Sequence, residues 1–546
     1  MKKLLAMLLA AVMLCSVFSF AMADEGSEPA WAEYDQLIAD IKASTDFAAR
    51  AELMHKAEDM LMDTGAVLPI YYYNDVYMAK SDFTGFYSNP YGTKFFMYAT
   101  NGDKTTVKMQ LASEPDKLDP ALNSTVDGAT LAANSFAGLY SYDANGNVAP
   151  NLATGVEVSE DGLTYVFTMR EGLKWSDGTD LDANDFVYSW KRAAATATAA
   201  DYAYMFNGIE GYPDDLNVTA SEDGKLFTVK LTAPCAYMMD LAAFPTFFAV
   251  QKACVEAAPD KDTNPGAWAL EAGFVSCGAY TLESWTHDQS MVYVKNPYYW
   301  DAENVKIERI ELMLSDDDTA IFTAYQNGDL DFIDSVATDQ IAAQLENPEF
   351  HIVDELGNYY VCFNVKSPLF DGKTVEQAAN MRKALSKLVD RQYIIDTVGQ
   401  TGQKIATTFI PVGMADGNGG VFHAVDGEGY YGTEVDVEGA IELLKTAGYE
   451  FDENGMLSAE TPLSFEYLTN NTSGHVAIAE CLQQDFAAVG INMTIKSLDW
   501  KVFLNERKSG NYDIARNGWV ADFNDPINML EMWTTDSGNN DIQFGK

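Results

Sequence analysis

Residues that commonly carry out catalysis are few and scattered in this sequence. There is no Gly-x-Ser-x-Gly elbow, no His-Glu-x-x-His pair and no phosphate loop ending in Gly-Lys-Ser/Thr. The histidines are dispersed along the chain, at His55, His287, His351, His423 and His475. A histidine-based metal site or catalytic triad is therefore not expected, and carboxylate pairs carry little information among 81 Asp and Glu residues. We expect a protein that is not an enzyme and that uses no metal or cofactor.

The first 23 residues have the features of a secretory signal. Lys2 and Lys3 precede an apolar stretch, and residues 21–23 form a small-x-small cleavage site. Cys15 offers the alternative of a lipoprotein anchor, although Leu14 occupies a position where such signals carry a small residue. We expect export across the cytoplasmic membrane to the periplasm or cell envelope, without membrane insertion of the mature chain.

The net charge restricts the possible binding partners, and the cysteine count restricts the possible disulfides. A formal net charge of −46 repels phosphate backbones and anionic lipids, which argues against nucleic-acid and membrane-surface partners. Five cysteines follow the signal, so at least one thiol is unpaired or paired between molecules. Cys235 with Cys254 is the candidate bridge, and buried free thiols are the alternative.

Hydrophobic periodicity predicts the elements that would position a site. Residues 37–41 and 48–61 read as helices, and residues 67–73 read as an aromatic strand. Asn-Gly at 101–102 predicts a hairpin between the strands on either side of it. Two Asp-Gly turns within residues 156–233 each lead into an alternating strand, which indicates two strands of one sheet.

From about residue 300 onwards, strands and helices alternate, which is typical of an α/β fold. The predicted elements are 307–314, 320–327, 359–364, 378–389, 437–447, 463–468, 477–488 and 492–498.

Longer motifs add a second kind of information. They lie at residues 54–99, 112–121, 170–179, 185–192, 296–301, 389–391, 440–448 and 511–526. In combination they resemble the extracellular solute-binding proteins of ABC importers, in particular the large oligopeptide-binding branch. The resemblance implies an exported protein that captures oligopeptides between two lobes and delivers them to a membrane permease.

The resemblance also implies a mixed α/β fold of the periplasmic-binding-protein type II. One lobe would combine residues 78–126 and 246–355, with an extra subdomain at 127–245. The other lobe would consist of residues 356–546, completed by residues 24–77. The product is expected to be a monomer.

The order of these motifs differs from that of the family. Residues 54–99 resemble the family's carboxy-terminal tail, yet the stretch that resembles its mature start, 112–121, comes afterwards. The helix that would follow residue 546 in a relative matches residues 29–38. The sequence therefore predicts a circular permutation, with the Asn-Gly turn joining the former termini.

The resemblance assigns ligand binding first to residues 519–526, Trp-Val-Ala-Asp-Phe-Asn-Asp-Pro. In relatives, the aspartate that matches Asp522 takes the free α-amino group of the ligand, and neighbouring main chain pairs with the peptide. Trp519, Val520 and Ala521 share this motif; since Val520 replaces a cysteine of the family, no disulfide is expected there. A turn cap is the alternative role of Asp522.

The resemblance extends the candidate site to other segments. Its members are Arg507, Arg516, His475, Trp500, Tyr71, Tyr72, Tyr73, Ser113, Glu114 and Pro115. The two arginines and His475 match positions near the ligand's carboxylate end or in an internal ion pair. The aromatic residues and the 113–115 turn would line the cleft, and core packing is the alternative for the tyrosines.

Two other functions remain open at this point. One is a member of the same superfamily that binds a metal chelate, haem, sugar or cell-wall fragment. The other is a peptide sensor or scavenger that works without a transporter. The expected charge of Asp522 favours peptide, because a sugar brings no ammonium group.

Overall fold

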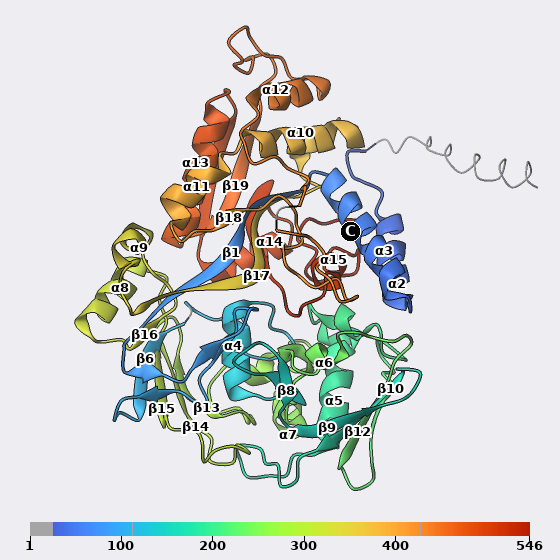
Figure 1. Cartoon of the computed structure of the whole chain (residues 1–546), viewed down its shortest axis with the longest axis vertical. Coiled ribbons are helices and arrows are strands. Elements are labelled where there is room, and N and C mark those ends of the chain that lie inside the picture. Colours follow the sequence, from blue (N-terminus) through green and yellow to red (C-terminus); the bar gives the residue numbers. More distant parts are fainter. Residues whose placement is uncertain (1–25, 112, 426) are drawn as a thin grey trace, which may run out of the picture.

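The computed structural model describes residues 26–111, 113–425 and 427–546. The predicted signal, 1–23, lies outside the described residues. Within them, two lobes share one large mixed sheet (Figure 1). We call the part with α12 the upper lobe and the part with α5 the lower lobe, as they stand in that view.

The large sheet has 11 strands in the described part of the chain. In spatial order they are β13 (Tyr280–Thr286), β14 (Ser290–Lys295), β15 (Arg309–Met313), β6 (Thr106–Gln110), β16 (Phe332–Ile333), β1 (Val67–Ala79), β17 (Phe350–Phe363), β21 (Ile514–Val520), β19 (Ser464–Asn470) and β20 (Asn492–Leu498), with β18 (Lys404–Ile405) pairing β1. β1 and β17 are the longest and run antiparallel from Val67↔Cys362 to Met78↔Phe350. These two strands connect the lobes, since β16 pairs one end of β1 while β21 pairs the opposite end of β17.

The lower lobe adds a second, antiparallel sheet. Its strands, in order, are β11 (Val218–Ala220), β12 (Leu226–Lys230), β10 (Thr164–Met169) and β9 (Ala153–Val158). The two predicted Asp-Gly strands are therefore neighbours, β10 and β12. Asp182 is the N-cap residue of α5 (Ala183–Ala194) and forms a capping box. Its side chain accepts from a backbone N–H of the first turn, and the side chain of Asp185 accepts from the backbone N–H of Asp182.

The remaining strands form two-stranded pairs, and helices cover the sheets. The pairs are β2 (Phe83–Thr84) with β5 (Thr100–Asn101), β3 (Tyr87–Ser88) with β4 (Lys94–Phe95), and β7 (Tyr140–Tyr142) with β8 (Val148–Pro150). The other helices are α2 (Ala32–Ala43), α3 (Phe47–Asp63), α4 (Val126–Ser135), α6 (Met238–Leu241), α7 (Lys252–Ala257), α8 (Asp318–Asn327), α9 (Thr338–Gln344), α10 (Val375–Leu388), α11 (Arg391–Ile394), α12 (Val437–Thr446), α13 (Ser473–Ala487), α14 (Trp500–Lys508) and α15 (Ile527–Glu531). The elements predicted beyond residue 300 are confirmed, although β17 begins nine residues before the predicted 359.

The segment before β1 packs on the upper lobe. Trp31 donates its indole N–H to the carbonyl of Trp533 (2.8 Å), and the Tyr34 hydroxyl donates to the carbonyl of Leu530 (2.9 Å). Helices α2 and α3 thereby cover α15 (Figure 1). Apolar side chains of α2 are buried with those of α15 in one core, so this segment is an integral part of the lobe.

The prediction of a hairpin at Asn101-Gly102 is wrong. Gly102 takes a φ of +55° and Lys104 N–H donates to the Asn101 carbonyl (2.9 Å), so the turn itself forms. The flanking strands nevertheless separate: β5 pairs β2, and β6 lies parallel to β15 and β16 in the large sheet. β6 therefore pairs with the strands among which it is buried in the lower lobe, and the local turn does not determine its strand partners.

The five cysteines of the described residues are free, so the candidate bridge between Cys235 and Cys254 does not form. Burial raises the pKa of both thiols, which disfavours the reactive thiolate. None of the helices in the described ranges combines the length and apolar character needed to cross a membrane.

Candidate functional site

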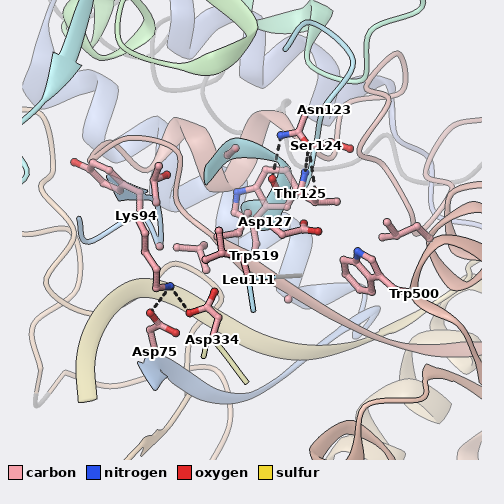
Figure 2. A pocket seen from close by; sticks show the side chains of 18 of the residues that line it. Asp75, Lys94, Leu111, Asn123, Ser124, Thr125, Asp127, Asp334, Trp500 and Trp519 are labelled. Atoms are coloured by element: carbon pink, nitrogen blue, oxygen red, sulfur yellow. Dashed lines mark hydrogen bonds and ion pairs between the residues drawn. The ribbon is translucent and has the colours of Figure 1, made fainter. Parts of the chain in front are cut away.

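A cavity of about 410 Å³ lies between the two lobes. Its wall combines residues from β1, α4, the start of α13, α14 and β21, elements far apart in the sequence. This size is within the range of small-molecule and cofactor sites. Figure 2 shows part of the wall, with Trp500 at one side, Lys94 and its two aspartates at the other, and Trp519 between them.

Asp522 lies in this wall, two residues after the end of β21. Its Oδ2 accepts from the Asn528 amide (2.8 Å) and its Oδ1 from the Tyr202 hydroxyl (3.1 Å). Its own N–H donates to Asn528 Oδ1 (2.9 Å), so Asn528 fixes both ends of the residue. Both side-chain donors are neutral, and the carboxylate makes no ion pair within the described residues.

Burial raises the pKa of Asp522 to about 7, because the ionised carboxylate loses hydration. The hydrogen bonds from Asn528 and Tyr202 oppose this shift, whereas the negative charge of Glu531 adds to it. A cation brought beside Asp522 would restore its charged form, since an opposite charge lowers a carboxyl pKa.

Arg516 projects from β21 into the same cavity and also lacks a carboxylate partner in the described part of the chain. Its Nη2 donates to His475 Nε2 (3.0 Å), and the guanidinium lies 5.5 Å from the ring centre of Trp500 and 5.6 Å from that of Tyr359. Burial, with the adjacent Arg516 charge, lowers the pKa of His475 well below its usual value. His475 is therefore a neutral acceptor, and Arg516 keeps a net positive charge.

Arg507, from α14, differs in having a fixed counter-ion. Its Nε lies 2.9 Å from Asp541 Oδ2, and both side chains are nearly inaccessible to solvent. Both residues line the cavity. Of the two roles that the sequence left open for Arg507, the geometry supports the internal ion pair.

Some of the aromatic candidates line the cavity and others do not. Tyr73, Trp500 and Trp519 line the cavity together with Val520. Tyr71 is buried in the upper-lobe core, stacked on Tyr359.

Tyr72 and Ala521 also lie outside the cavity. The Tyr72 hydroxyl pairs with Thr408 Oγ1 (2.6 Å) on the opposite face of β1, because neighbouring strand residues point to opposite sides. Ala521 is buried and donates its N–H to Leu356 O (2.7 Å).

The three residues of the 113–115 turn also differ in whether they line the cavity. Ser113 lines the cavity. Glu114 instead binds His287 Nδ1 (2.6 Å) and accepts from the N–H of Asp288 (2.9 Å), away from the cavity, and Pro115 is buried. The expectation that the whole turn lines the cleft is therefore wrong for Glu114 and Pro115.

Sequence reasoning missed a charged group on the lower wall. Lys94 Nζ lies 2.8 Å from Asp75 Oδ2 and 2.8 Å from Asp334 Oδ1, as Figure 2 shows. Burial raises the pKa of Asp334 to about 6 even though Lys94 opposes the shift. Burial also raises the pKa of nearby Glu355 well above its usual value. Asp75 and Lys94 lie within the motif at 54–99, but nothing in that motif marks them as a charged group. β4 pairs with β3, and only tertiary packing brings Lys94 to Asp75 of β1 and to Asp334, the residue after β16.

Direct contacts join the lobes around the cavity. Tyr202 of the lower lobe reaches Asp522, Asp201 pairs with Lys508 of α14, and Asp318 accepts from the backbone N–H of Ser473 (3.2 Å). No sequence pattern marks Tyr202, because it meets Asp522 only through a contact between segments far apart in the chain. The two lobes are thus held together over the cavity.

Comparison with known proteins identifies the family. Residues 147–541 match the model described as "Bacterial extracellular solute-binding proteins, family 5 Middle". The oligopeptide-binding protein OppA of Bacillus subtilis is 30% identical over 80% of this chain and 79% of its own length. The periplasmic oligopeptide-binding protein OppA of Salmonella typhimurium is 30% identical, covering 81% of this chain and 79% of its own length.

The same relationship holds in three dimensions. The crystal structure of Haemophilus influenzae OppA in complex with RPPGFSPFR superimposes with a TM-score of 0.71 at 27% identity, over 81% of this chain and 85% of that one. The family comprises solute-binding proteins and is not an enzyme class. This mixed α/β chain, with a cavity between its lobes, belongs to the bacterial extracellular solute-binding proteins of family 5.

Proposed function

We propose that the protein captures oligopeptides in the interlobe cavity and delivers them to the membrane permease of an ABC importer. The observation that carries this proposal is the unpaired carboxylate of Asp522 in the cavity wall. A buried charge is costly unless it is paired, so this group suits a ligand with an ammonium at that position. The α-amino group of a peptide meets that requirement with a charge-assisted hydrogen bond.

The second unpaired charge supports a ligand that carries both signs. Arg516 has a neutral histidine and aromatic rings as neighbours, and so it is available for a carboxylate. We assign it to the peptide's carboxylate end or to an acidic side chain. Trp500, Trp519 and Tyr73 offer flat surfaces for side chains of different sizes.

The pairing of β21 supports main-chain recognition. β21 pairs with β17 as far as Val520, whereas its pairing with β19 ends at Ala515. Beyond Ala515, β19 leaves one edge of the strand unused. An extended peptide added at this edge would be read through its main chain, which tolerates many sequences.

Two alternatives give different expectations. A sugar or haem ligand would leave Asp522 without a cation, which is the reason we prefer peptide. A transporter-independent sensor or scavenger would bind the same peptides, and only the presence of a cognate permease distinguishes it.

The decisive experiment compares one peptide in its free-amine and N-acetylated forms by calorimetry. We expect the acetylated form to bind much more weakly, because it lacks the ammonium. Equal affinity would overturn the assignment of Asp522. Native mass spectrometry of the purified protein would identify co-purifying ligands and test the peptide class independently.

We also propose that the chain is a circular permutation of the family's fold. Residues 24–77 would complete the upper lobe of residues 356–546, while residues 78–126 and 246–355 would form the other lobe with an extra subdomain at 127–245. Support comes from the packing of Trp31 and Tyr34 on α15 and from the central place of β1 in the sheet. Deleting residues 24–77 should abolish cooperative unfolding and peptide binding; a deletion variant that melts and binds like the parent would refute this.

Export, cellular location and assembly belong to the same proposal. We propose that residues 1–23 direct export, that the mature monomer works in the periplasm or at the cell envelope, and that its closed form is read by the permease.

A further inference from the structure

Two histidines that are distant in the sequence meet beside a buried glutamate on α3. His55 and Glu58 are three residues apart on this helix and so share one face. His423 comes from the glycine-rich loop at 413–432. One ligand atom from each of the three residues lies within 4.8 Å of the other two.

Glu58 is held as a metal-binding carboxylate would be. Its Oε1 accepts the backbone N–H groups of Phe409 (3.1 Å) and Ile410 (2.9 Å). Its Oε2 lies 2.6 Å from His423 Nε2. The side chain is fully buried, so the backbone fixes one oxygen and directs the other towards the histidines. Hydrogen bonds to the second oxygen of a ligating carboxylate are a regular feature of metal sites.

The imidazole rings are held by packing. His55 stacks on Phe422 with ring centres 3.8 Å apart, and its ring lies 5.5 Å from that of His423. His55 is the most exposed of the three ligands, so one side of the group opens to solvent.

We propose that His55, Glu58 and His423 form a binding site for a divalent transition-metal ion of the zinc class. Two imidazoles and one carboxylate are a donor set suited to Zn²⁺, while Mg²⁺ and Ca²⁺ prefer oxygen ligands alone. The ion would replace the proton between His423 and Glu58. Their 2.6 Å contact would open to about 3.3 Å, the spacing of neighbouring ligands around a tetrahedral zinc.

Such an ion would connect the amino-terminal segment to the surroundings of Asp522. The 413–432 loop contacts the turn after Asp522, since the N–H of Ala415 donates to Asn524 Oδ1 (2.8 Å). The ion would fix this loop against α3. We therefore expect the metal to raise thermal stability without contacting the peptide.

Calorimetric titration of the full mature protein with Zn²⁺, in excess Mg²⁺ to occupy the acidic surface, tests the proposal. We expect one ion per chain, and His55→Ala should weaken Zn²⁺ binding by at least about tenfold, the lower end of the loss seen when a mere supporting residue is removed. This variant keeps the contact between Glu58 and His423, so its fold should be retained. His287→Ala is the matched control: His287 also contacts carboxylates, at 2.6 Å and 3.4 Å, but without a second imidazole.

Equal Zn²⁺ affinity in the parent and in His55→Ala would overturn the site, as would an equal loss in His287→Ala. Absence of Zn²⁺ binding in the presence of Mg²⁺ would show that the three side chains form a hydrogen-bonded cluster only. Peptide affinity measured on the same variants should not change, so the metal site and the proposed peptide site fail independently.

Discussion

Arg507 and Arg516 line the same cavity and are almost equally buried, 8% and 7% exposed, yet their charges are balanced differently. Arg507 has Asp541 at 2.9 Å. Arg516 has aromatic rings and the neutral His475, and it makes no ion pair among the described residues. Equal burial with unequal compensation indicates that one arginine holds the wall together, while the other is available to a ligand.

The same contrast separates two aspartates. Asp541 is neutralised by Arg507, whereas Asp522 receives hydrogen bonds only from neutral groups. Asp522 and Arg516 are thus groups of opposite charge in one cavity, and neither has a counter-ion among the described residues. A zwitterionic ligand would compensate both, which is the physical basis of the peptide proposal.

Breaking the ion pair should have the largest effect, and it should affect stability. Arg507→Gln leaves Asp541 buried without its partner, which costs about 3–5 kcal/mol in comparable buried pairs. Chemical denaturation should show this loss in the ligand-free protein. Arg516→Gln is the control, and it should destabilise much less because no carboxylate is abandoned. Similar losses in both variants would contradict the comparison.

Removing the unpaired carboxylate should affect binding instead. Asp522→Asn keeps the side-chain shape and should weaken binding of a free-amine peptide by about 2–5 kcal/mol, the cost of truncating one member of a buried charge pair. Calorimetry measures the loss directly. An N-acetylated peptide should bind the parent and the variant alike, and a loss of equal size for both peptides would argue against an ammonium at this position.

The unpaired arginine should matter somewhat less. Arg516→Gln should weaken a peptide with a free carboxylate by about 1.5–3 kcal/mol, the value of a hydrogen bond to a charged group. A peptide amidated at its carboxyl end should show little difference between parent and variant, unless it carries an acidic side chain. If the amidated peptide loses as much affinity as the free acid, Arg516 does not meet the carboxylate end.

Local patterns predicted the elements well and the contacts less well. The helices and strands beyond residue 300 follow from their hydrophobic periods. The contiguous motif at 519–526 points to Asp522, which lies in the cavity wall. The Asn101-Gly102 turn led to the wrong prediction of a hairpin, because the pairing of strands depends on burial across the whole lobe. No pattern points to the roles of Tyr202 and Lys94 at the cavity, since both residues reach it only when segments far apart in the sequence meet.

The smallest expected effect is a pH-dependent change in stability. The Asp522 substitution, which should weaken peptide binding, should stabilise the ligand-free protein. In the ligand-free protein the pKa of Asp522 is raised to about 7 by burial, against about 3.9 for an unperturbed Asp. The folded state therefore binds a proton that the unfolded state releases. This contribution to stability is fully present below about pH 4 and is lost as pH rises through 7. Asn at this position carries no such dependence.

Asp522→Asn should consequently be more stable than the parent at pH 8, by about 1–3 °C in melting temperature, and the gain should shrink towards pH 4. Because the two proteins are compared at the same pH, the contributions of the other buried carboxyls to the pH dependence of stability cancel, including those of Asp334 and Glu355. A gain that does not change with pH would mean that Asp522 keeps an ordinary pKa. A pH-dependent gain, together with lost peptide binding, would show that the free protein bears an unfavourable charge which its ligand relieves.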